Sequence, residues 1–312
     1  MSLLRLLSRK LQTAKYLTSD AIALRYTPWE FLLLYVSYAI ANFTGRDRKL
    51  SEAVYEERLR REARRDGCWA FRDAKLPRMN AAYEKMLFTG IFRDTLLVYT
   101  KYDDCYDESL IDDLFVKLPE GPYGLRNGTV DVRVAQGDVV IDAGSWAGDF
   151  AAYASAKGAS AIYAFEPTDE TFEYLLKTAA LNPNIHPVKA GLGEAKASAS
   201  FFVTHEMNSV SNTLMPGRVA GEERTVSITT IDDFVRENAL PRVDFIKADI
   251  EGAERQMLMG AAETLRRFAP KLAICTYHLP DDPEVLERII KEANPEYRVV
   301  QKAKKLFASV GA

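Results

Sequence analysis

Two glycines and an acid follow an apolar run near the middle of the chain, in a pattern that could hold a nucleotide-like ligand. Residues 140–150 read V-I-D-A-G-S-W-A-G-D-F, so Asp142 ends the apolar run and Gly144 and Gly148 lie four residues apart. An apolar-periodic helical pattern begins directly afterwards. A strand, a tight turn and a helix start are typical of the turns that bind a pyrophosphate in nucleotide-binding α/β folds.

The residues between and after these glycines argue against a phosphate. A dinucleotide fingerprint would require glycines where this chain has Trp146 and Asp149. A side chain at Trp146 hinders close approach to a pyrophosphate, and Asp149 in the first helical turn would repel a phosphate bound there. No G-K-[S/T] follows, which excludes a P-loop. The turn therefore favours a ligand without phosphate, such as S-adenosylmethionine, with its ammonium, carboxylate, sulfonium, ribose and adenine.

A second acid supports this interpretation. Glu166 ends the next strand-like run in Y-A-F-E-P, 24 residues after Asp142, where a carboxylate can accept hydrogen bonds from both ribose hydroxyls. Asp142 is then expected to face the cationic end of the ligand. The residues predicted to bind the cofactor are Asp142, Ala143, Gly144, Ser145, Trp146, Gly148, Phe150, Glu166, Pro167, Gly191, Leu192 and Asp249.

Further polar residues fall at the ends of later strand-like runs, where open α/β sheets bind their ligands. F-I-K-A-D-I-E-G-A-E places Asp249 at a strand end and Glu251 and Glu254 in the next helical turn, and A-I-C-T-Y-H places His278 after another strand. Acids at a helix start can equally be caps, and a loop histidine can be structural. We predict catalytic roles for His278, Asp249 and Glu251, with His278 the first candidate for a general base. A divalent metal on these three residues is an alternative, but no dense ligand spacing supports it and no metal is predicted.

The elements that position these residues alternate between strands and helices from residue 138. Strands are expected at 138–142, 161–166, 185–190, 243–248 and 271–277, and helices at 148–157, 169–180, 231–238, 251–268 and 282–293. Further strand-like runs lie at 94–100, 129–135, 198–204 and 224–230. Two short runs joined by a polar turn end the chain and predict a closing hairpin with one antiparallel edge strand. The fold class is α/β, with a mostly parallel sheet and right-handed crossovers.

The first 90 residues differ from this pattern and are expected to be helical. They include a charged helix at 46–66 that ends at Gly67, and an apolar run at 31–43 that is too short to span a bilayer comfortably. This run is preceded by a capping box and predicts a buried or partner-facing helix, with contact to a membrane surface as the alternative. We divide the chain into a helical region, 1–90, acting as a partner surface, lid or dimerisation element, and a catalytic domain, 91–312.

Composition bounds the function further. The 312 residues carry a net charge of −3, so no global basic excess indicates a nucleic-acid partner. The three cysteines are odd in number and far apart, which argues against a disulfide framework and favours the cytoplasm. His186 and His205 have no supporting context.

Several of these motifs together resemble the FkbM-type methyltransferases. The resemblance covers roughly residues 119–310, with K-x-D-x-E-G-x-E (247–254) as its most specific mark, and includes E-G-P-Y-G (120–124) and T-T-I-D-D (229–233). It implies a Rossmann-like fold, S-adenosylmethionine as methyl donor, and O-methylation of sugar or natural-product hydroxyls. It also implies that the donor binds at 142–150 and Glu166, with Asp249 and Glu251 beside the reacting centre. N-S-V-S-N (208–212) resembles a polar loop of the family that approaches donor or acceptor.

Other functions remain open from the sequence. They are N-methylation of a small molecule or protein, a nicotinamide-dependent oxidoreductase, and a donor-binding module without catalysis. Trp146 and Asp149 argue against the oxidoreductase, and the intact acids and glycines argue against a decayed site. The acceptor and the oligomeric state, for which a homodimer is one option, are not decided by these residues.

Overall fold

The computed structural model describes residues 123–203, 222–302 and 304–311, together with residues 29, 32, 64–65, 67–71, 74–80, 83 and 106–107. The chain divides into two compact units, residues 1–70 and 71–312. In the first unit, β1 (Arg64–Arg65) pairs antiparallel with β2 (Cys68–Phe71) across a turn in which Gly67 has φ +76°. The prediction that the charged helix continues to residue 66 is wrong, because this turn reverses the chain into a hairpin.

Most of the predicted helical region, including the apolar run at 31–43, lies outside the described residues. Within residues 1–90 the structure also describes β3 (Ala74–Pro77), a strand where helix was predicted, which lies beside α6 and α7 of the second unit. None of the helices among the described residues is long and apolar enough to cross a membrane.

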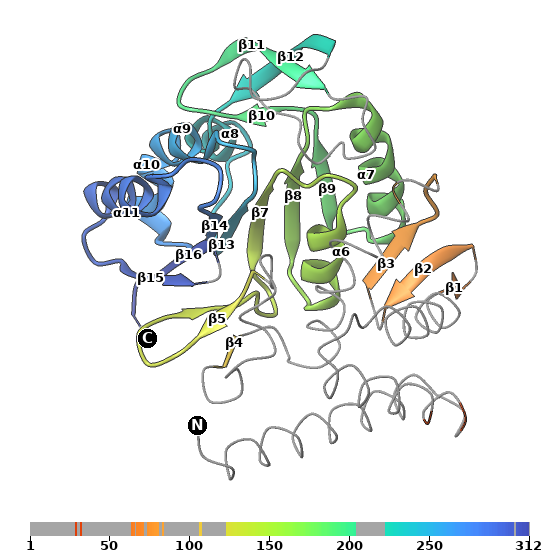
Figure 1. The fold of residues 1–312 in the computed structure, drawn as a ribbon, viewed down its shortest axis with the longest axis horizontal. Coiled ribbons are helices and arrows are strands. Elements are labelled where there is room, and N and C mark those ends of the chain that lie inside the picture. Colours follow the sequence, from red (N-terminus) through yellow and green to blue (C-terminus); the bar gives the residue numbers. More distant parts are fainter. Residues whose placement is uncertain are drawn as a thin grey trace, which may run out of the picture. The chain divides into compact units, whose positions relative to one another are not determined.

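The second unit is built on a seven-stranded sheet in the order β15-β16-β14-β13-β7-β8-β9 (Figure 1). Its strands are β7 (Val139–Ala143), β8 (Ala161–Phe165), β9 (Ile185–Val188), β13 (Phe245–Ala248), β14 (Lys271–Cys275), β15 (Arg298–Lys302) and β16 (Lys305–Ser309). β9, β8, β7, β13 and β14 are parallel neighbours, whereas β16 is antiparallel to both β14 and β15. The Rossmann-like, mostly parallel sheet with a terminal hairpin is therefore confirmed.

The position of the antiparallel strand differs from the prediction. Because β16 runs against both of its neighbours, the edge strand β15 has the same direction as β14. The hairpin turn returns the chain into the gap between β14 and β15, so the antiparallel strand lies one place inside the edge. The prediction of an antiparallel edge strand is wrong for this reason.

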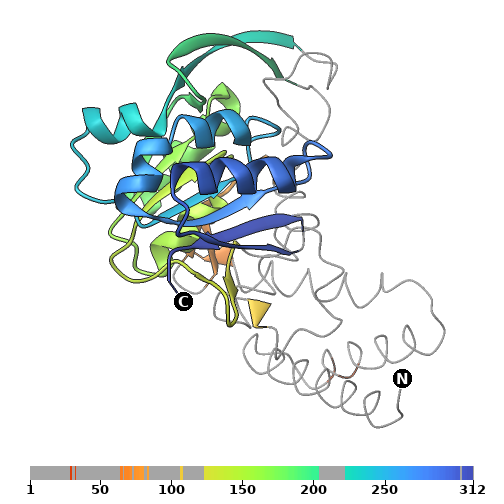
Figure 2. The same ribbon diagram turned by 90° about the vertical axis from the view of Figure 1, so that its left-hand side faces the viewer.

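Helices cover both faces of the sheet (Figures 1 and 2). They are α6 (Asp149–Ala156), α7 (Asp169–Leu181), α8 (Ile231–Glu237), α9 (Glu254–Met259), α10 (Ala262–Phe268) and α11 (Asp282–Ala293). Successive strand residues point to opposite faces, so Ile141 packs with α8–α11 while Val140 packs with α6 and α7. The sheet is therefore packed between two apolar layers.

The predicted helix at 251–268 is two helices, α9 and α10. They are separated at Gly260, where a Cβ atom would lie 2.1 Å from the backbone oxygen of Gly193. This close approach of two backbones needs a glycine, and it turns the chain between the two helices. The prediction of a single helix was wrong because the helical spacing of apolar residues continues across Gly260.

Two of the predicted extra strands form a separate small sheet. β11 (Ala197–Val203) pairs antiparallel with β12 (Glu222–Thr229), and β10 (Gly191–Leu192) joins β12 in parallel. The strand-like run at 129–135 contributes only β6 (Asp131–Val132), which pairs with β5 (Leu125–Arg126), beside β4 (Tyr106–Asp107). The run at 94–100 and the loop at 208–212 lie outside the described residues.

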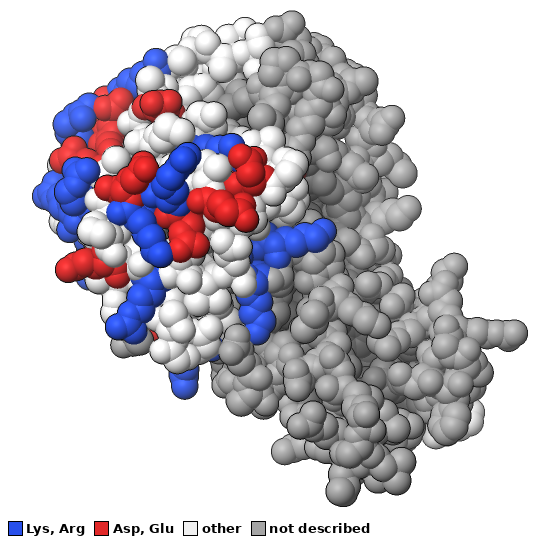
Figure 3. All heavy atoms as spheres, turned by 60° about the vertical axis from the view of Figure 1, so that its left-hand side comes forward, with Lys and Arg blue, Asp and Glu red and all other residues white. Residues whose placement is uncertain are grey.

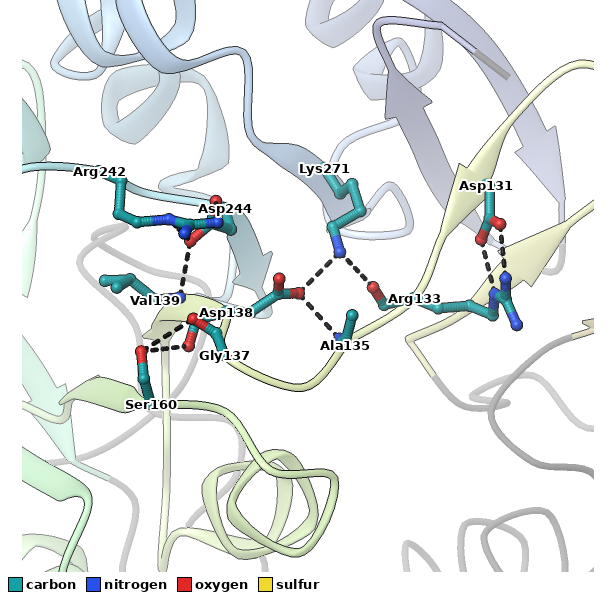
Figure 4. Close-up of polar contacts among 10 residues, drawn as sticks. All are labelled: Asp131, Arg133, Ala135, Gly137, Asp138, Val139, Ser160, Arg242, Asp244 and Lys271. Atoms are coloured by element: carbon teal, nitrogen blue, oxygen red, sulfur yellow. Dashed lines mark hydrogen bonds and ion pairs between the residues drawn. The ribbon is translucent and has the colours of Figure 1, made fainter.

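The amino ends of the central strands are fixed by a polar network (Figure 4). Lys271 Nζ lies 2.7 Å from Asp138 Oδ2, and it donates to the backbone oxygen of Arg133 at 2.6 Å. Asp244 accepts from the backbone N–H of Val139 at 2.8 Å. These groups bond one another between β7, β13 and β14, so they stabilise the end of the sheet opposite to the predicted ligand site.

The described surface shown in Figure 3 carries charges of both signs. On and around α11 they are arranged as pairs such as Lys291 with Glu287 and Arg255 with Asp281, at 2.6 Å each. Exposed pairs of this kind contribute little stability. Interspersed charges on this face fit the absence of a basic excess in the composition.

Candidate active site

The sheet brings the predicted site residues together at its carboxyl edge. β7 lies between β8 and β13, and Asp142 is level with Ala164 on one side and Lys247 on the other. Glu166, Asp249 and the segment leading to His278 therefore leave neighbouring strands at one edge.

The turn after β7 approaches the end of β13 so closely that only glycine fits. Gly144 has φ +74°, and a Cβ atom there would lie 2.0 Å from the backbone oxygen of Asp249. The backbone N–H of Asp249 also donates to Ala143 at 3.1 Å. The turn after β7 and the predicted reacting centre are thus in direct backbone contact.

The N–H groups of this turn are used within the protein. Gly144 and Ser145 donate to the backbone oxygen of Phe165 at 3.1 and 2.9 Å, and Gly148 donates to that of Ser145 at 2.7 Å. Trp146 donates to Glu166 Oε2 at 3.1 Å. Since a phosphate-binding turn points such groups at the ligand, these bonds favour a ligand without phosphate.

Several side chains predicted to contact the cofactor pack into the protein instead. Trp146 has φ +49° and stacks on Tyr83 with ring centroids 5.4 Å apart, and Phe150 is buried against Tyr123. A Cβ atom on Gly148 would lie 2.8 Å from Leu175. These residues shape the turn through packing, and any ligand contact from them would come from the backbone.

The third predicted strand end lies in β10. Gly191 is level with Ile228 of β12, and a Cβ atom there would lie 2.7 Å from that side chain. Leu192 is buried in the core beside α8. Its side chain therefore contributes to packing, and Gly191 remains a predicted backbone contact.

Glu166, which follows β8, is hydrogen-bonded to the turn that follows the neighbouring strand β7. Its Oε1 accepts from the N–H of Thr168 at 2.9 Å while Oε2 accepts from Trp146, and Pro167 between them is half-buried. Burial raises the pKa of Glu166, and the backbone hydrogen bond from Thr168 opposes that rise. The hydroxyls of Thr168 and Thr171 also act to lower this pKa, and a carboxylate oxygen can accept more than one hydrogen bond.

Asp142 faces Lys247 rather than an open site. Its side chain is wholly buried, and Lys247 Nζ lies 3.0 Å from Oδ1. Lys247 also donates to the backbone oxygen of Gly144 at 2.7 Å. Burial works to lower the pKa of Lys247, but nearby carboxylates, first among them Asp142, hold it above its ordinary value. The predicted contact of Asp142 with a ligand cation conflicts with this geometry, because an internal ammonium takes that place.

Asp149 is a carboxylate whose charge is unfavourable where it lies. Burial raises the pKa of Asp149 to about 6, although Lys247 opposes the rise. It follows Gly148 in the first turn of α6, at the same edge as Glu166. Perturbed acids of this kind occur often at functional sites.

Asp249 lies where two tyrosine hydroxyls converge. Tyr123 donates to Oδ2 and Tyr277 donates to Oδ1, each at 2.8 Å. Burial works to raise the pKa of Asp249, but Lys247, His278 and the tyrosine hydrogen bonds hold it below its ordinary value. The side chain keeps partial exposure, so it remains accessible as an anion.

His278 is enclosed by three carboxylates. Nδ1 lies 2.8 Å from Glu254 Oε1, a short contact that is not aligned as a hydrogen bond, and Nε2 lies 3.5 Å from Glu251 Oε2 and 3.6 Å from Asp249 Oδ1. Burial works to lower the pKa of His278, but Glu251 and Glu254 raise it to about 10. The imidazole is therefore protonated at neutral pH, which conflicts with the predicted role of His278 as a general base.

Sequence reasoning gave no role at this site to Tyr123, Tyr277 or Asp149. Tyr123 lies in the quoted E-G-P-Y-G stretch and Tyr277 directly precedes His278, so both had a positional signal. Residues 120–122, 205 and 208–212 lie outside the described residues, and His186 stacks on Tyr163 away from these strand ends.

Comparison with known proteins agrees with this geometry. Residues 137–298, about half of the chain, match the methyltransferase FkbM domain. The hexuronic acid methyltransferase AglP of Haloferax volcanii is 28% identical over 163 residues, which cover 50% of this chain and 62% of that protein. Methyltransferase sdnD of Sordaria araneosa is 28% identical over 193 residues, covering 52% and 66%. The chain thus spans less than two thirds of either relative.

Among solved structures, the methyltransferase FkbM of Methylobacillus flagellatus is similar with a TM-score of 0.45 and 21% identity, covering 57% of this chain and 44% of that one. On the match of the FkbM domain to half of its length, the chain belongs to the FkbM methyltransferase family.

Proposed function

We propose that this protein is an S-adenosylmethionine-dependent methyltransferase that methylates a hydroxyl oxygen of a sugar or natural product. The observation that carries the proposal is Glu166, a buried carboxylate at the end of β8 that is fixed by the turn after β7 and whose oxygens can each accept more than one hydrogen bond. This is the arrangement that a ribose diol requires.

The charges at the strand ends fit the rest of the donor. Asp149 supplies a carboxylate for the donor ammonium, and its raised pKa fits a group that lacks a full cationic partner in the free protein. The turn from Ala143 to Gly148 leaves no cluster of spare backbone N–H groups for a phosphate. When bound, S-adenosylmethionine supplies an electrophilic methyl group attached to a sulfonium.

The acceptor is expected near Asp249 and Tyr277. Methyl transfer is an in-line displacement, so much of the rate comes from aligning the acceptor oxygen with the methyl carbon. The name of AglP states that it acts on a hexuronic acid, which supports an acceptor of the sugar class for this chain as well. Asp249 is placed to orient a hydroxyl by accepting its hydrogen bond.

A binding titration tests the donor assignment. S-adenosylhomocysteine is expected to bind the full chain, with NAD not competing, in isothermal titration calorimetry. Glu166→Gln is expected to weaken binding by roughly 10–100-fold, because the amide would turn a donor toward one of two backbone N–H groups. Glu170→Gln, at an exposed position four residues later, is the matched control. Binding of NAD without S-adenosylhomocysteine would overturn the proposal, and labelled methyl transfer into a cell lysate identifies the acceptor.

Asp149→Asn is expected to stabilise the free protein above about pH 6. The pKa of Asp149 rises on folding from 3.8 to about 6, so ionisation of this partly buried carboxylate destabilises the folded state at high pH. The variant should gain about 1–2 kcal/mol of unfolding free energy at pH 8, and this gain should vanish below about pH 4, where the acid is protonated in both states. Urea denaturation at the two pH values measures it. A gain independent of pH would contradict the assignment.

A further inference from the structure

His278 has a ring nitrogen that points between two carboxylates at ion-pair distance, without a hydrogen bond of ordinary length to either. Its side chain is wholly buried, and Nε2 lies 3.5 Å from Glu251 Oε2 and 3.6 Å from Asp249 Oδ1. Hydrogen bonds from nitrogen to oxygen are about 2.7–3.2 Å long, so both distances are too great. Neither ring nitrogen has an aligned hydrogen-bond partner. A buried polar atom in this state calls for a partner.

The spacing suits a shared cation. Two ligand atoms on one divalent ion, each about 2.1 Å from it, are separated by roughly 3–3.5 Å. One ligand atom each from Asp249, Glu254 and His278 already lie within 4.8 Å of one another. These three groups are thus close together, and Glu251 Oε2, 3.5 Å from His278 Nε2, has the spacing of a further ligand to the same ion.

Glu254 holds the imidazole in place from the other side. Its Oε1 is 2.8 Å from His278 Nδ1, and its two oxygens accept from the backbone N–H groups of Ile250 and Gly252 at 2.9 and 3.0 Å. A histidine that binds a metal usually has a carboxylate or carbonyl on its other nitrogen, which fixes the ring. Glu254 lies at the corresponding place, 2.8 Å from Nδ1 of His278.

The backbone at Glu251 has an unfavourable conformation. Glu251 has φ +54°, a left-handed conformation that is unfavourable for a residue with a side chain. The side chains of Glu251 and Asp249 keep exposed fractions of 21% and 22%, which leaves a route from solvent. Strain that aims an accessible carboxylate at a buried imidazole is typical of a ligand site.

We propose that His278 Nε2, Asp249 and Glu251 bind a divalent cation of the Mn²⁺ or Mg²⁺ class, with Glu254 orienting the imidazole. Two carboxylates with one imidazole favour ions that accept both oxygen and nitrogen ligands. Binding requires the neutral imidazole, so the cation replaces the proton that these carboxylates otherwise hold there. The inference rests on the proposed function in one respect: the cation would polarise an acceptor hydroxyl beside Asp249 and favour loss of its proton to solvent.

Manganese binding tests this directly on the full chain. Free Mn²⁺ is followed by electron paramagnetic resonance during titration, and one ion per chain is expected. His278→Gln and Glu251→Gln are each expected to weaken binding at least 10-fold, and Mg²⁺ should compete. His186→Ala, at an exposed histidine, and Asp233→Asn, at an acid outside the cluster, are the matched controls and should bind as the wild type does.

Two outcomes would overturn the site: no Mn²⁺ bound by the wild type, or equal binding by the wild type and His278→Gln. S-adenosylhomocysteine binding, measured on the same samples, shows that each variant is folded. If it binds while Mn²⁺ does not, the metal site fails and the donor assignment stands. If Mn²⁺ binds at His278 while S-adenosylhomocysteine does not, the donor assignment fails and the metal site stands.

Discussion

Replacing Asp142 with asparagine is expected to lower the free energy of unfolding by about 3 kcal/mol. Lys247 is buried, and the Asp142 carboxylate 3.0 Å from its Nζ is the largest of the charges that hold its pKa up. Asparagine keeps the shape but leaves the ammonium without its nearest counter-charge. Urea denaturation should show a lower midpoint with an unchanged slope.

Two control variants distinguish the loss of the Asp142–Lys247 ion pair from the loss of any carboxylate. Asp169→Asn removes an exposed partner of Lys189 and should change the unfolding free energy by less than about 1 kcal/mol. The double variant Asp142→Asn with Lys247→Met should lose less than the sum of the single losses, because neither charge is then left alone. Additive losses would show that the two residues do not act as a pair.

This result would also reverse an expectation drawn from the sequence. The sequence predicted that Asp142 faces the cationic end of the ligand. Period-two alternation placed Asp142 and Lys247 each on its own strand, but it could not show that β7 and β13 are neighbours. Strand order is a tertiary property, and here it converts a predicted ligand contact into an internal ion pair.

The fold was more predictable than the site because the apolar pattern is local. Strands and helices from residue 138 follow the alternation of periods two and 3.6, which each segment carries by itself. The failures were at places where distant backbones meet. The predicted helix at 251–268 is interrupted at Gly260, where the backbone of Gly193 comes close. The final hairpin places β16 between β14 and β15.

At the site, the sequence identified the strand ends but not the protonation states. His278 follows a strand and precedes a loop, which suggested a neutral base. Its actual charge depends on Glu251 and Glu254, which lie on another strand end and approach only in the folded chain. His278 could therefore be recognised as a candidate metal ligand only from distances between atoms in the folded chain, and the spacing of residues along the sequence does not give these distances.

Gly144→Ala is expected to have the largest effect on ligand binding of any single methyl addition in the described chain. The new Cβ would lie 2.0 Å from the backbone oxygen of Asp249, and a backbone atom cannot rotate away as a side chain can. Either the turn or the end of β13 must move by about 1 Å, which displaces Asp249 from the proposed donor site. S-adenosylhomocysteine should bind at least about 100-fold more weakly, with several kcal/mol lost from the unfolding free energy.

Gly137→Ala is the control that makes this loss interpretable. Gly137 has φ +85°, close to the +74° of Gly144, but nothing lies within 4 Å of the position that its Cβ would take. Both variants carry the left-handed backbone strain of about 1 kcal/mol, and only Gly144→Ala carries the collision with β13. The difference between the two variants therefore measures the contact between the donor turn and the Asp249 strand end. Suppose that Gly144→Ala and Gly137→Ala lose equal stability and that neither changes ligand affinity. The turn after β7 and the end of β13 could then move apart without disturbing the site. The inference that their contact fixes the ligand site would be wrong.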